Sequence, residues 1–158
     1  MKRVGLVRTL KGTIVFLAAM VAICYIGIFP HSIQEMGIQN ANVSWLVTPG
    51  IVAVSISAIP IMIALILFWR ICTEVGRDNS FCYQNARWLG GIGFCALIDT
   101  GYCAVGTVTL EVLVGGSPVW LLGMGVCIVG FAIALAAFLL SHLVLKAAAL
   151  KSENDLTI

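Results

Sequence analysis

The sequence predicts an all-α integral membrane protein, a four-helix bundle of membrane-spanning helices with both termini in the cytoplasm (N-in/C-in). Of its 158 residues, 61% are hydrophobic and only 10% are charged, whereas a soluble domain carries about 25% charged residues. A helix needs about 20 apolar residues to cross a hydrocarbon core about 30 Å thick, and four such stretches occupy most of the chain. We therefore expect one membrane domain over residues 1–150, followed by a polar, disordered cytoplasmic tail at 151–158.

The basic residues predict the orientation of the spans. All Lys and Arg precede the first apolar stretch, separate the second from the third, or follow the fourth: Lys2, Arg3, Arg8, Lys11, Arg70, Arg77, Arg87, Lys146 and Lys151. The connections at 30–44 and 115–119 contain none. Because basic residues are retained on the cytoplasmic side during insertion, this pattern indicates a multi-pass protein with both termini inside, and we expect it in a bacterial plasma membrane. A cleaved amino-terminal signal peptide is the alternative for the first stretch, but the charge pattern requires that this span is kept.

The span boundaries follow from hydropathy, Trp and Pro. We expect spans at 13–29, 45–69, 88–114 and 119–145, with Pro30 ending the first. The four Trp residues fall near predicted span ends, where amphipathic indole rings favour the headgroup region. Residues 31–44 are expected to form a polar outer loop. The Gly- and Pro-containing segment 115–118 predicts a tight turn that makes the last two spans antiparallel neighbours.

Small residues recur on one face of the fourth predicted span. Without a hydrophobic driving force in lipid, small side chains that let backbones approach are the usual basis of helix contact. We therefore expect this face to pack on a helix, either within the chain or in a homo-oligomer, with a pore lining as the lesser alternative. The predicted packing face consists of Gly123, Cys127, Gly130, Ala134, Ala137 and Ser141.

Asp99 is the most conspicuous single residue, because it lies near the centre of the third span. A carboxylate at that depth costs about 2.5–3.5 kcal/mol on insertion scales. Tyr102 and Cys103, three and four residues later, are placed on the helix face where they can lean toward it. One interpretation is a proton or cation site. The other is a structural staple to a neighbouring helix, for example to Ser55 or Ser57, and both remain open.

Proline at position 60 predicts a kink in the second span. Proline removes one backbone hydrogen bond and leaves the carbonyl of Ile56 without that partner. Ser55 or Ser57 is expected to help satisfy the polar groups there. Whether the kink acts as a hinge does not follow from the sequence.

The sequence offers little for catalysis or metal binding. The six Cys form no C-x-x-C pair and no cluster with His, and no nucleophile–base pairing or phosphate-binding glycine loop is found. We expect no metal, no cofactor and no enzymatic activity. An intramembrane enzyme would need a second polar group facing Asp99. The net charge of +2 is too small to predict direct binding of nucleic acid.

The longest predicted cytoplasmic connection runs over residues 70–89. Gly76 is expected to cap the second span with a positive φ, and Arg77 to meet lipid headgroups. Three residues able to cap the next helix follow at 78–80. Phe81 and Asn85 then recur at helical spacing, so Phe81 is expected to pack against the bundle.

Gly76, Phe81, Asn85 and Leu89 form a Gly–x4–Phe–x3–Asn–x3–Leu pattern in this connection. With its length and four-span plan, the sequence resembles a small bacterial membrane family catalogued as a domain of unknown function, family number twenty-nine seventy-five. Members more often carry Thr and acidic residues where this chain has Cys82 and Tyr83. The resemblance implies a companion of small helix-turn-helix repressors encoded beside it, and hence a regulatory role.

Two functional hypotheses follow. The leading one is a non-enzymatic interaction or regulatory protein that binds a cytoplasmic helix-turn-helix partner through residues 70–87. The alternative is a small transporter, channel or immunity protein, possibly oligomeric, in which Asp99 and Cys103 line a polar path through the bilayer.

Overall fold

The computed structural model describes residues 2–39, 41–77, 82–115 and 119–155, and every element within these ranges is helical. The elements in chain order are α1 (Lys2–Ile23), the π-helix η1 (Cys24–Ile28), α2 (Phe29–Gln39), the 3₁₀-helix η2 (Ala41–Leu46), α3 (Val47–Gly76), α4 (Tyr83–Val114) and α5 (Val119–Asp155).

Four helical stretches are long and apolar enough to cross a membrane: Val7–Ile38, Ser44–Gly76, Tyr83–Val114 and Trp120–Glu153. This confirms the all-α prediction with four spans. Each of these stretches overlaps one predicted span, at 13–29, 45–69, 88–114 or 119–145. The helices extend beyond most of the predicted ends.

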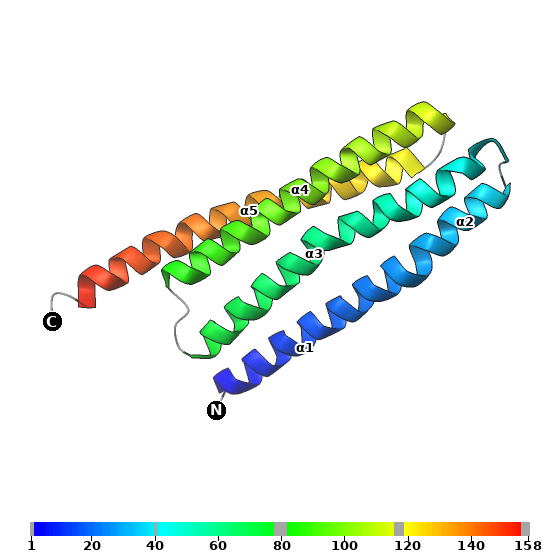
Figure 1. The fold of residues 1–158 in the computed structure, drawn as a ribbon. Coiled ribbons are helices and arrows are strands. Elements are labelled where there is room, and N and C mark those ends of the chain that lie inside the picture. The colour runs from blue at the N-terminus through cyan, green and yellow to red at the C-terminus, as the bar shows by residue number, and fades with distance from the viewer. Residues whose placement is uncertain (1, 40, 78–81, 116–118, 156–158) are drawn as a thin grey trace.

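The helices form an open row in which α1 packs on α3, α3 on α4 and α4 on α5, each antiparallel to its neighbour (Figure 1). Over the part of the chain that the structure describes, α1 and α5 make no extensive contact with each other and form the two edges of the row. The antiparallel pairing of the last two spans agrees with the prediction from the turn at 115–118. The position of the first two spans in the row was not readable from the sequence.

The first span does not end at Pro30. Helices α1, η1 and α2 join into one rod over residues 2–39 (the first rod), so residues 31–39 are helical where a loop was expected. The physical reason is the π-turn before the proline, in which the Phe29 N–H donates to the carbonyl of Cys24, five residues back. Such a wider turn accommodates the proline ring and the missing N–H within a continuous helix.

The chain also stays helical after the fourth span. Helix α5 continues to Asp155, so residues 151–155 are helical where a disordered tail was expected; residues 156–158 lie outside the described ranges. The segment at 147–151 is Ala-Ala-Ala-Leu-Lys, and all these residue types are strong helix formers. Intrinsic propensity therefore extends the helix beyond the apolar stretch.

The small face of α5 packs against α4. A side chain at Gly123 would overlap Thr107, and one at Gly130 would overlap Thr100. The spacing is seven residues on both helices, which is the repeat of antiparallel helices that stay in register over several turns. The interface between α4 and α5 therefore depends on the absence of side chains at these two glycines.

The remaining members of this face lie along the same interface. Ala134 and Ala137 are buried, and the thiol of Cys127 donates a long hydrogen bond of 3.8 Å to the carbonyl of Thr100. Nearer the chain ends, the Ser141 hydroxyl donates to the carbonyl of Ala86 over 2.6 Å. The structure thus uses the predicted packing face within one chain.

The α4–α5 interface generates the first prediction. Gly130→Val should destabilise the protein by about 1–3 kcal/mol, because the added side chain overlaps Thr100 and forces the helices apart. Gly125→Val is the matched control on the same helix, since a Cβ there meets no atom within 4 Å. The free energy of unfolding in mixed micelles measures both variants. Equal losses for the two variants would show that the effect does not come from packing against Thr100.

Candidate intramembrane binding site

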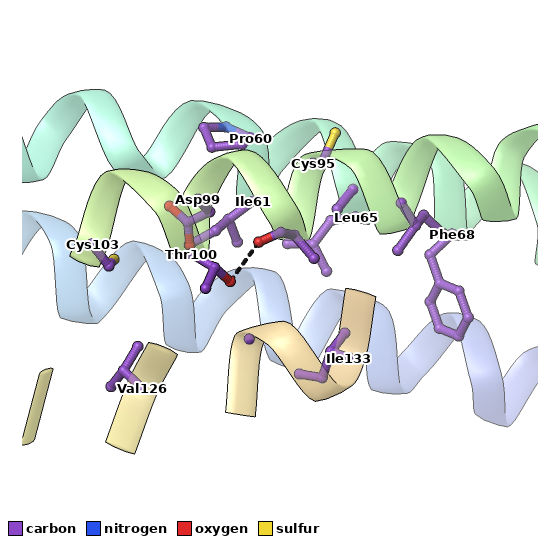
Figure 2. Close-up of a pocket in the computed structure, with 14 residues that line it drawn as sticks. Pro60, Ile61, Leu65, Phe68, Cys95, Asp99, Thr100, Cys103, Val126 and Ile133 are labelled. Atoms are coloured by element: carbon purple, nitrogen blue, oxygen red, sulfur yellow. Dashed lines mark hydrogen bonds between the residues drawn. The ribbon is translucent and has the colours of Figure 1, made fainter. Parts of the chain in front are cut away.

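A groove of about 300 Å³ lies between α3, α4 and α5. Its walls are almost entirely apolar, with Pro60, Ile61 and Leu65 on α3 and Val126 and Ile133 on α5. Figure 2 shows Asp99, Thr100 and Cys103 on the α4 side of this space, with Asp99 across from Pro60 and Ile61. The groove therefore brings one carboxyl group into contact with apolar walls from two other helices.

Asp99 lies at the middle of α4, fifteen and sixteen residues from its two ends. At about 1.5 Å per residue, the carboxyl is about 22–24 Å from either end along the helix. Its Oδ1 atom is buried, and among the described residues no hydrogen-bond partner reaches it. No Lys, Arg or His within the described ranges acts electrostatically on the carboxyl. Asp99 is thus a carboxyl group at mid-membrane depth without a compensating cation from the resolved side chains.

The structure does not support the staple proposed between Asp99 and α3. The Ser55 hydroxyl donates to the carbonyl of Ile51 over 2.8 Å, and the Ser57 hydroxyl donates to Val54 over 2.9 Å. Neither hydroxyl is placed on the carbonyl of Ile56, which Pro60 leaves without its usual partner. A helical Ser or Thr reaches the carbonyl of its own preceding turn more readily than a group on another helix.

Ser57 is engaged by a second helix as well. Its oxygen lies 3.0 Å from the Tyr25 hydroxyl in η1. Because the one Ser57 hydroxyl hydrogen goes to Val54, Tyr25 must be the donor in this pair. Tyr25 and Ser57 therefore link the first rod to α3 at the depth of the groove.

The sequence predicted that Tyr102 leans toward Asp99, but in the structure it does not. Its hydroxyl donates to the carbonyl of Ala53 over 2.8 Å and so joins α4 to α3. A phenol carries its hydroxyl far from its own backbone, which favours a partner on the neighbouring helix over one on its own. Cys103, in contrast, does line the groove beside Asp99.

Thr100, Pro60 and Gly130 also line the groove, and the sequence interpretation assigned none of them to the Asp99 site. Thr100 donates its hydroxyl to the carbonyl of Ala96 over 2.7 Å (Figure 2). One sequence signal does point to Pro60. It lies near the middle of its span, as Asp99 does, so antiparallel neighbours place the two residues at similar depth.

A second, smaller hollow of about 200 Å³ lies nearer the α4–α5 turn, where Glu111 and Trp120 are among its lining residues. Glu111 is thus the other acidic residue of α4, and it is placed outside the Asp99 groove. Gly115 follows with φ of 66°, and its N–H donates to the carbonyl of Glu111 over 2.9 Å. A positive φ at this glycine ends α4 where the turn was predicted; residues 116–118 lie outside the described ranges.

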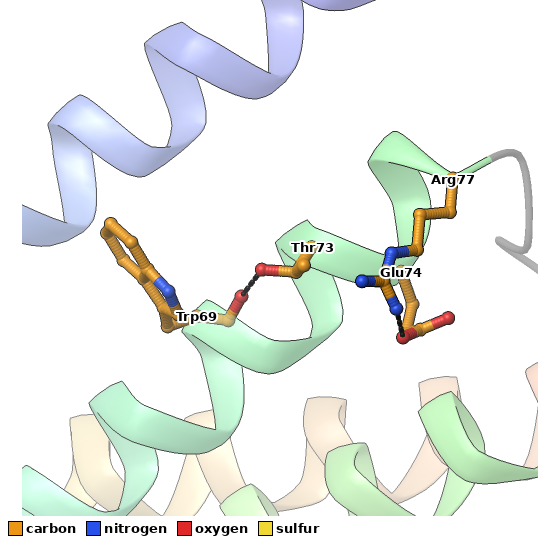
Figure 3. A network of polar contacts seen from close by, with 4 residues as sticks. All are labelled: Trp69, Thr73, Glu74 and Arg77. Carbon is orange, nitrogen blue, oxygen red and sulfur yellow. Dashed lines mark hydrogen bonds and ion pairs between the residues drawn. The ribbon is translucent and has the colours of Figure 1, made fainter.

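The connection between α3 and α4 is only partly described. Arg77 pairs with Glu74 at 3.3 Å, and Thr73 bonds the carbonyl of Trp69 one turn earlier (Figure 3). The Arg77 side chain is 72% exposed. Phe81 lies outside the described residues, so its predicted contact with the bundle is not placed.

The other members of the sequence pattern are structural in character. Gly76 is helical, without the positive φ that was expected, and ends α3. A Cβ at Gly76 would lie 3.3 Å from a methyl of Val7 in α1, so its small size matters for helix approach. Asn85 is 1% exposed in the first turn of α4, and Leu89 is half-buried. Neither Asn85 nor Leu89 therefore presents an exposed side chain to which a cytoplasmic partner could bind.

The comparisons with known proteins agree with this architecture. The family model described as "Protein of unknown function (DUF2975)" matches residues 31–158. The "Uncharacterized membrane protein YoaS" of Bacillus subtilis (strain 168) is 26% identical over 106 residues, which are 65% of this chain and 66% of that relative. The alignment thus spans slightly less than two thirds of the relative's length. No solved structure matches.

The family match covers most of the chain and includes the pattern from Gly76 to Leu89. The relative is described as a membrane protein, in agreement with the four apolar helices. The chain is therefore a multi-pass membrane protein that belongs to the DUF2975 family, a family of unknown function.

Proposed function

We propose that this protein is a non-enzymatic membrane protein that binds a ligand at Asp99, in the groove between α3, α4 and α5. The observation that carries the proposal is the buried Oδ1 atom of Asp99, which lacks a hydrogen-bond partner among the described residues. A buried polar group without a partner costs about 1–3 kcal/mol, and a ligand that satisfied it would recover that cost on binding. An ionisable residue inside a membrane is by default a candidate functional site.

This proposal belongs to the class of small transporters, channels and immunity proteins. Cys103 and Thr100 lie along the same side of the groove as Asp99, so the polar atoms follow α4 through the apolar surroundings. The carboxyl has a neighbouring space of about 300 Å³, which is at the lower end of the usual range for ligand sites, about 300–1,000 Å³. The size favours a small ligand over a macromolecule at this position.

We further infer that the protein lies in a bacterial plasma membrane with both termini in the cytoplasm. The antiparallel row brings the two chain ends and the α3–α4 connection to the same end of the molecule (Figure 1). The ammonium of Lys11 lies 5.1 Å from the centre of the Trp69 ring at this end, an arrangement suited to an interface rich in basic and aromatic residues. Every Lys and Arg of the sequence belongs to helix segments or connections at this end.

A second candidate function is regulation through residues 70–87, with a cytoplasmic helix-turn-helix protein as partner. The exposed Arg77 favours it, because its guanidinium is held by Glu74 and still faces solvent. Tyr83 and Arg87 in the first turns of α4 are exposed as well. A homo-oligomer is compatible with either function, since the outer sides of α1 and α5 are the open edges of the row.

The proposed site predicts that Asp99 reacts with dicyclohexylcarbodiimide, an apolar reagent that modifies protonated carboxyl groups. In the folded protein in lipid nanodiscs at pH 7, peptide mass spectrometry should find the adduct at Asp99 and about tenfold less at exposed acids such as Glu153. Asp99→Asn is the control for assignment of the adduct. An unreactive Asp99 in folded protein would contradict an accessible intramembrane carboxyl.

The proposed orientation predicts opposite labelling at the two ends of the row. In a cysteine-free background, Ser152→Cys near the end of α5 should resist a membrane-impermeant maleimide in intact cells and react after permeabilisation. Thr48→Cys at the start of α3 should react in intact cells. Both positions are exposed in the structure, so accessibility reports the side of the membrane. Labelling of Ser152→Cys in intact cells would contradict cytoplasmic termini.

The regulatory candidate predicts a specific role for Arg77. Arg77→Ala should lower recovery of a helix-turn-helix partner by about tenfold, equivalent to about 1.4 kcal/mol, because it removes an exposed cation from the proposed docking surface. Phe81→Ala tests the same surface, and Lys151→Ala is the matched loss of a basic residue elsewhere at this end. Unchanged recovery in both loop variants, measured by co-purification from the membrane, would remove this candidate.

A further inference from the structure

We propose that the Asp99 groove binds a monovalent lipophilic cation, an ammonium group on a small apolar body, in exchange for the proton of the Asp99 carboxyl. This inference rests on the proposed function, which places the binding site in this groove. It adds the chemical class of the ligand and the proton that leaves when the ligand enters.

The hydrogen-bonding capacity of the groove favours a cation. The Thr100 hydroxyl donates to Ala96, and the nearby Tyr102 and Ser57 hydroxyls donate to Ala53 and Val54. Their hydrogens are therefore engaged within the protein, and the strongest group that remains for a ligand is the carboxyl of Asp99. An anion would meet a carboxyl and no basic side chain from the described lining. A ligand that carries a positive charge or an N–H donor complements this arrangement.

The depth of the carboxyl determines what kind of cation fits. Asp99 is about 22–24 Å from the ends of α4. A group at the middle of the bilayer is separated from the headgroups by half the hydrocarbon core, about 15 Å. A phospholipid headgroup at the interface is too far away. Pro60, Ile61, Leu65 and Ile133 surround the site with apolar surface. The ligand must therefore bring an apolar body that enters the bilayer with its charge.

Inorganic cations fit the groove poorly. Calcium takes 6–8 oxygen ligands and magnesium requires near-octahedral coordination. Within the described residues, no group of three or more His, Cys, Asp or Glu is arranged to hold a metal ion, and Asp99 is the one acidic residue of the groove lining. An organic ammonium needs only one carboxylate partner, with apolar contacts for the rest of its surface.

The exchanged proton follows from the absence of a protein cation beside Asp99. In the empty groove the ionised carboxylate would be uncompensated in a low-dielectric site, so the carboxyl keeps its proton. When the ammonium enters, the carboxyl O–H bond breaks, the proton passes to water and the carboxylate pairs with the ligand. One positive charge enters and one leaves, so the charge of the site is unchanged.

The titratable neighbours of Asp99 do not supply a competing positive charge. From the first rod the neighbours are Tyr25 and Cys24, from α4 they are Cys95 and Cys103, and from α5 it is Cys127. The lining residues of α3 are apolar and carry no titratable group. Phenol and thiol groups are neutral or negative in all their states. The proton that competes with the cation is therefore the proton of Asp99.

The linkage between proton and ligand has a definite sign. Below the pH at which the empty carboxyl ionises, a cation must displace one proton, so its apparent dissociation constant should rise about tenfold for each unit by which the pH falls. Above that pH no proton is displaced, and the dissociation constant should be constant. A quaternary ammonium is the suitable probe, because it has no proton of its own to titrate.

The test uses the full chain in lipid nanodiscs with benzyltrimethylammonium as the cation. Neopentylbenzene is its neutral counterpart, with carbon in place of the nitrogen and nearly the same shape. Binding of radiolabelled cation is measured between pH 5 and pH 9, and protection of Asp99 from dicyclohexylcarbodiimide is measured on the same samples. Asp99→Asn removes the charge with little change in size, and Glu111→Gln removes the other acid of α4, which lies outside the groove.

The proposal predicts that the cation protects Asp99 at least tenfold better than neopentylbenzene, with the pH dependence given above. Asp99→Asn should weaken cation binding at least tenfold and abolish its pH dependence, while Glu111→Gln should change it less than twofold. Equal protection by the neutral compound would overturn the ligand class, and cation binding independent of pH throughout the range would overturn the exchange with the Asp99 proton. The protection experiment needs no variant, so a misfolded Asp99→Asn protein would not prevent the test.

Failure of this inference is distinguishable from failure of the proposed function. If Asp99 reacts with the carbodiimide but the cation gives no protection, the ligand class is wrong and the intramembrane site remains. If Asp99 does not react at all in folded protein, the proposed site itself is rejected, together with this inference.

Discussion

The structure depends on one constraint, the lack of hydrogen-bond partners in hydrocarbon. Every backbone amide inside the bilayer must bond within the protein, which accounts for the helical structure of every described element. The hydroxyls obey the same constraint, because Ser and Thr side chains donate to the carbonyl of the preceding turn: Thr9, Thr13, Ser55, Thr73, Thr100, Thr107 and Thr109. In contrast to these hydroxyls, the buried Oδ1 of Asp99 has no hydrogen-bond partner among the described residues.

The constraint also explains how the row of helices is joined. Tyr25 bonds Ser57 between the first rod and α3, and Tyr102 bonds Ala53 between α4 and α3. Cys127 and Ser141 then link α5 to α4. Each neighbouring pair thus has a polar contact in addition to side-chain packing, as is expected where lipid provides no hydrophobic drive for association.

The groove forms because α5 packs more closely on α4 than α3 does. Gly123 and Gly130 let α5 approach α4 until Thr107 and Thr100 fill the glycine positions. Toward α3, this pair of helices leaves a groove, in which Asp99 faces Pro60 and Ile61 of α3 and which Gly130 of α5 also lines. The same two helices, α3 and α4, flank the connection that carries Arg77. A ligand that changed their separation would act directly on the geometry of this connection, so the two candidate functions share their structural elements.

The sequence alone predicts the number of spans and their helical structure, because hydropathy and length depend only on composition along the chain. It also indicated the family, through the pattern from Gly76 to Leu89, and it identified Asp99, because a carboxyl in an apolar stretch is conspicuous wherever the helix packs. The small face of α5 was readable for the same reason, since helical spacing alone brings its residues to one side.

The groups that meet across helices depend on how the helices pack in three dimensions. The partners of Tyr102, Ser55 and Ser57 depend on the rotation and depth of neighbouring helices, which no local pattern encodes. The helix continues past Pro30 because the π-turn before it accommodates the proline, which would otherwise end or kink the helix. The groove depends on which helix lies on each side of α4. Local sequence determines what each helix offers, and the packing of the row determines which of those groups come into contact.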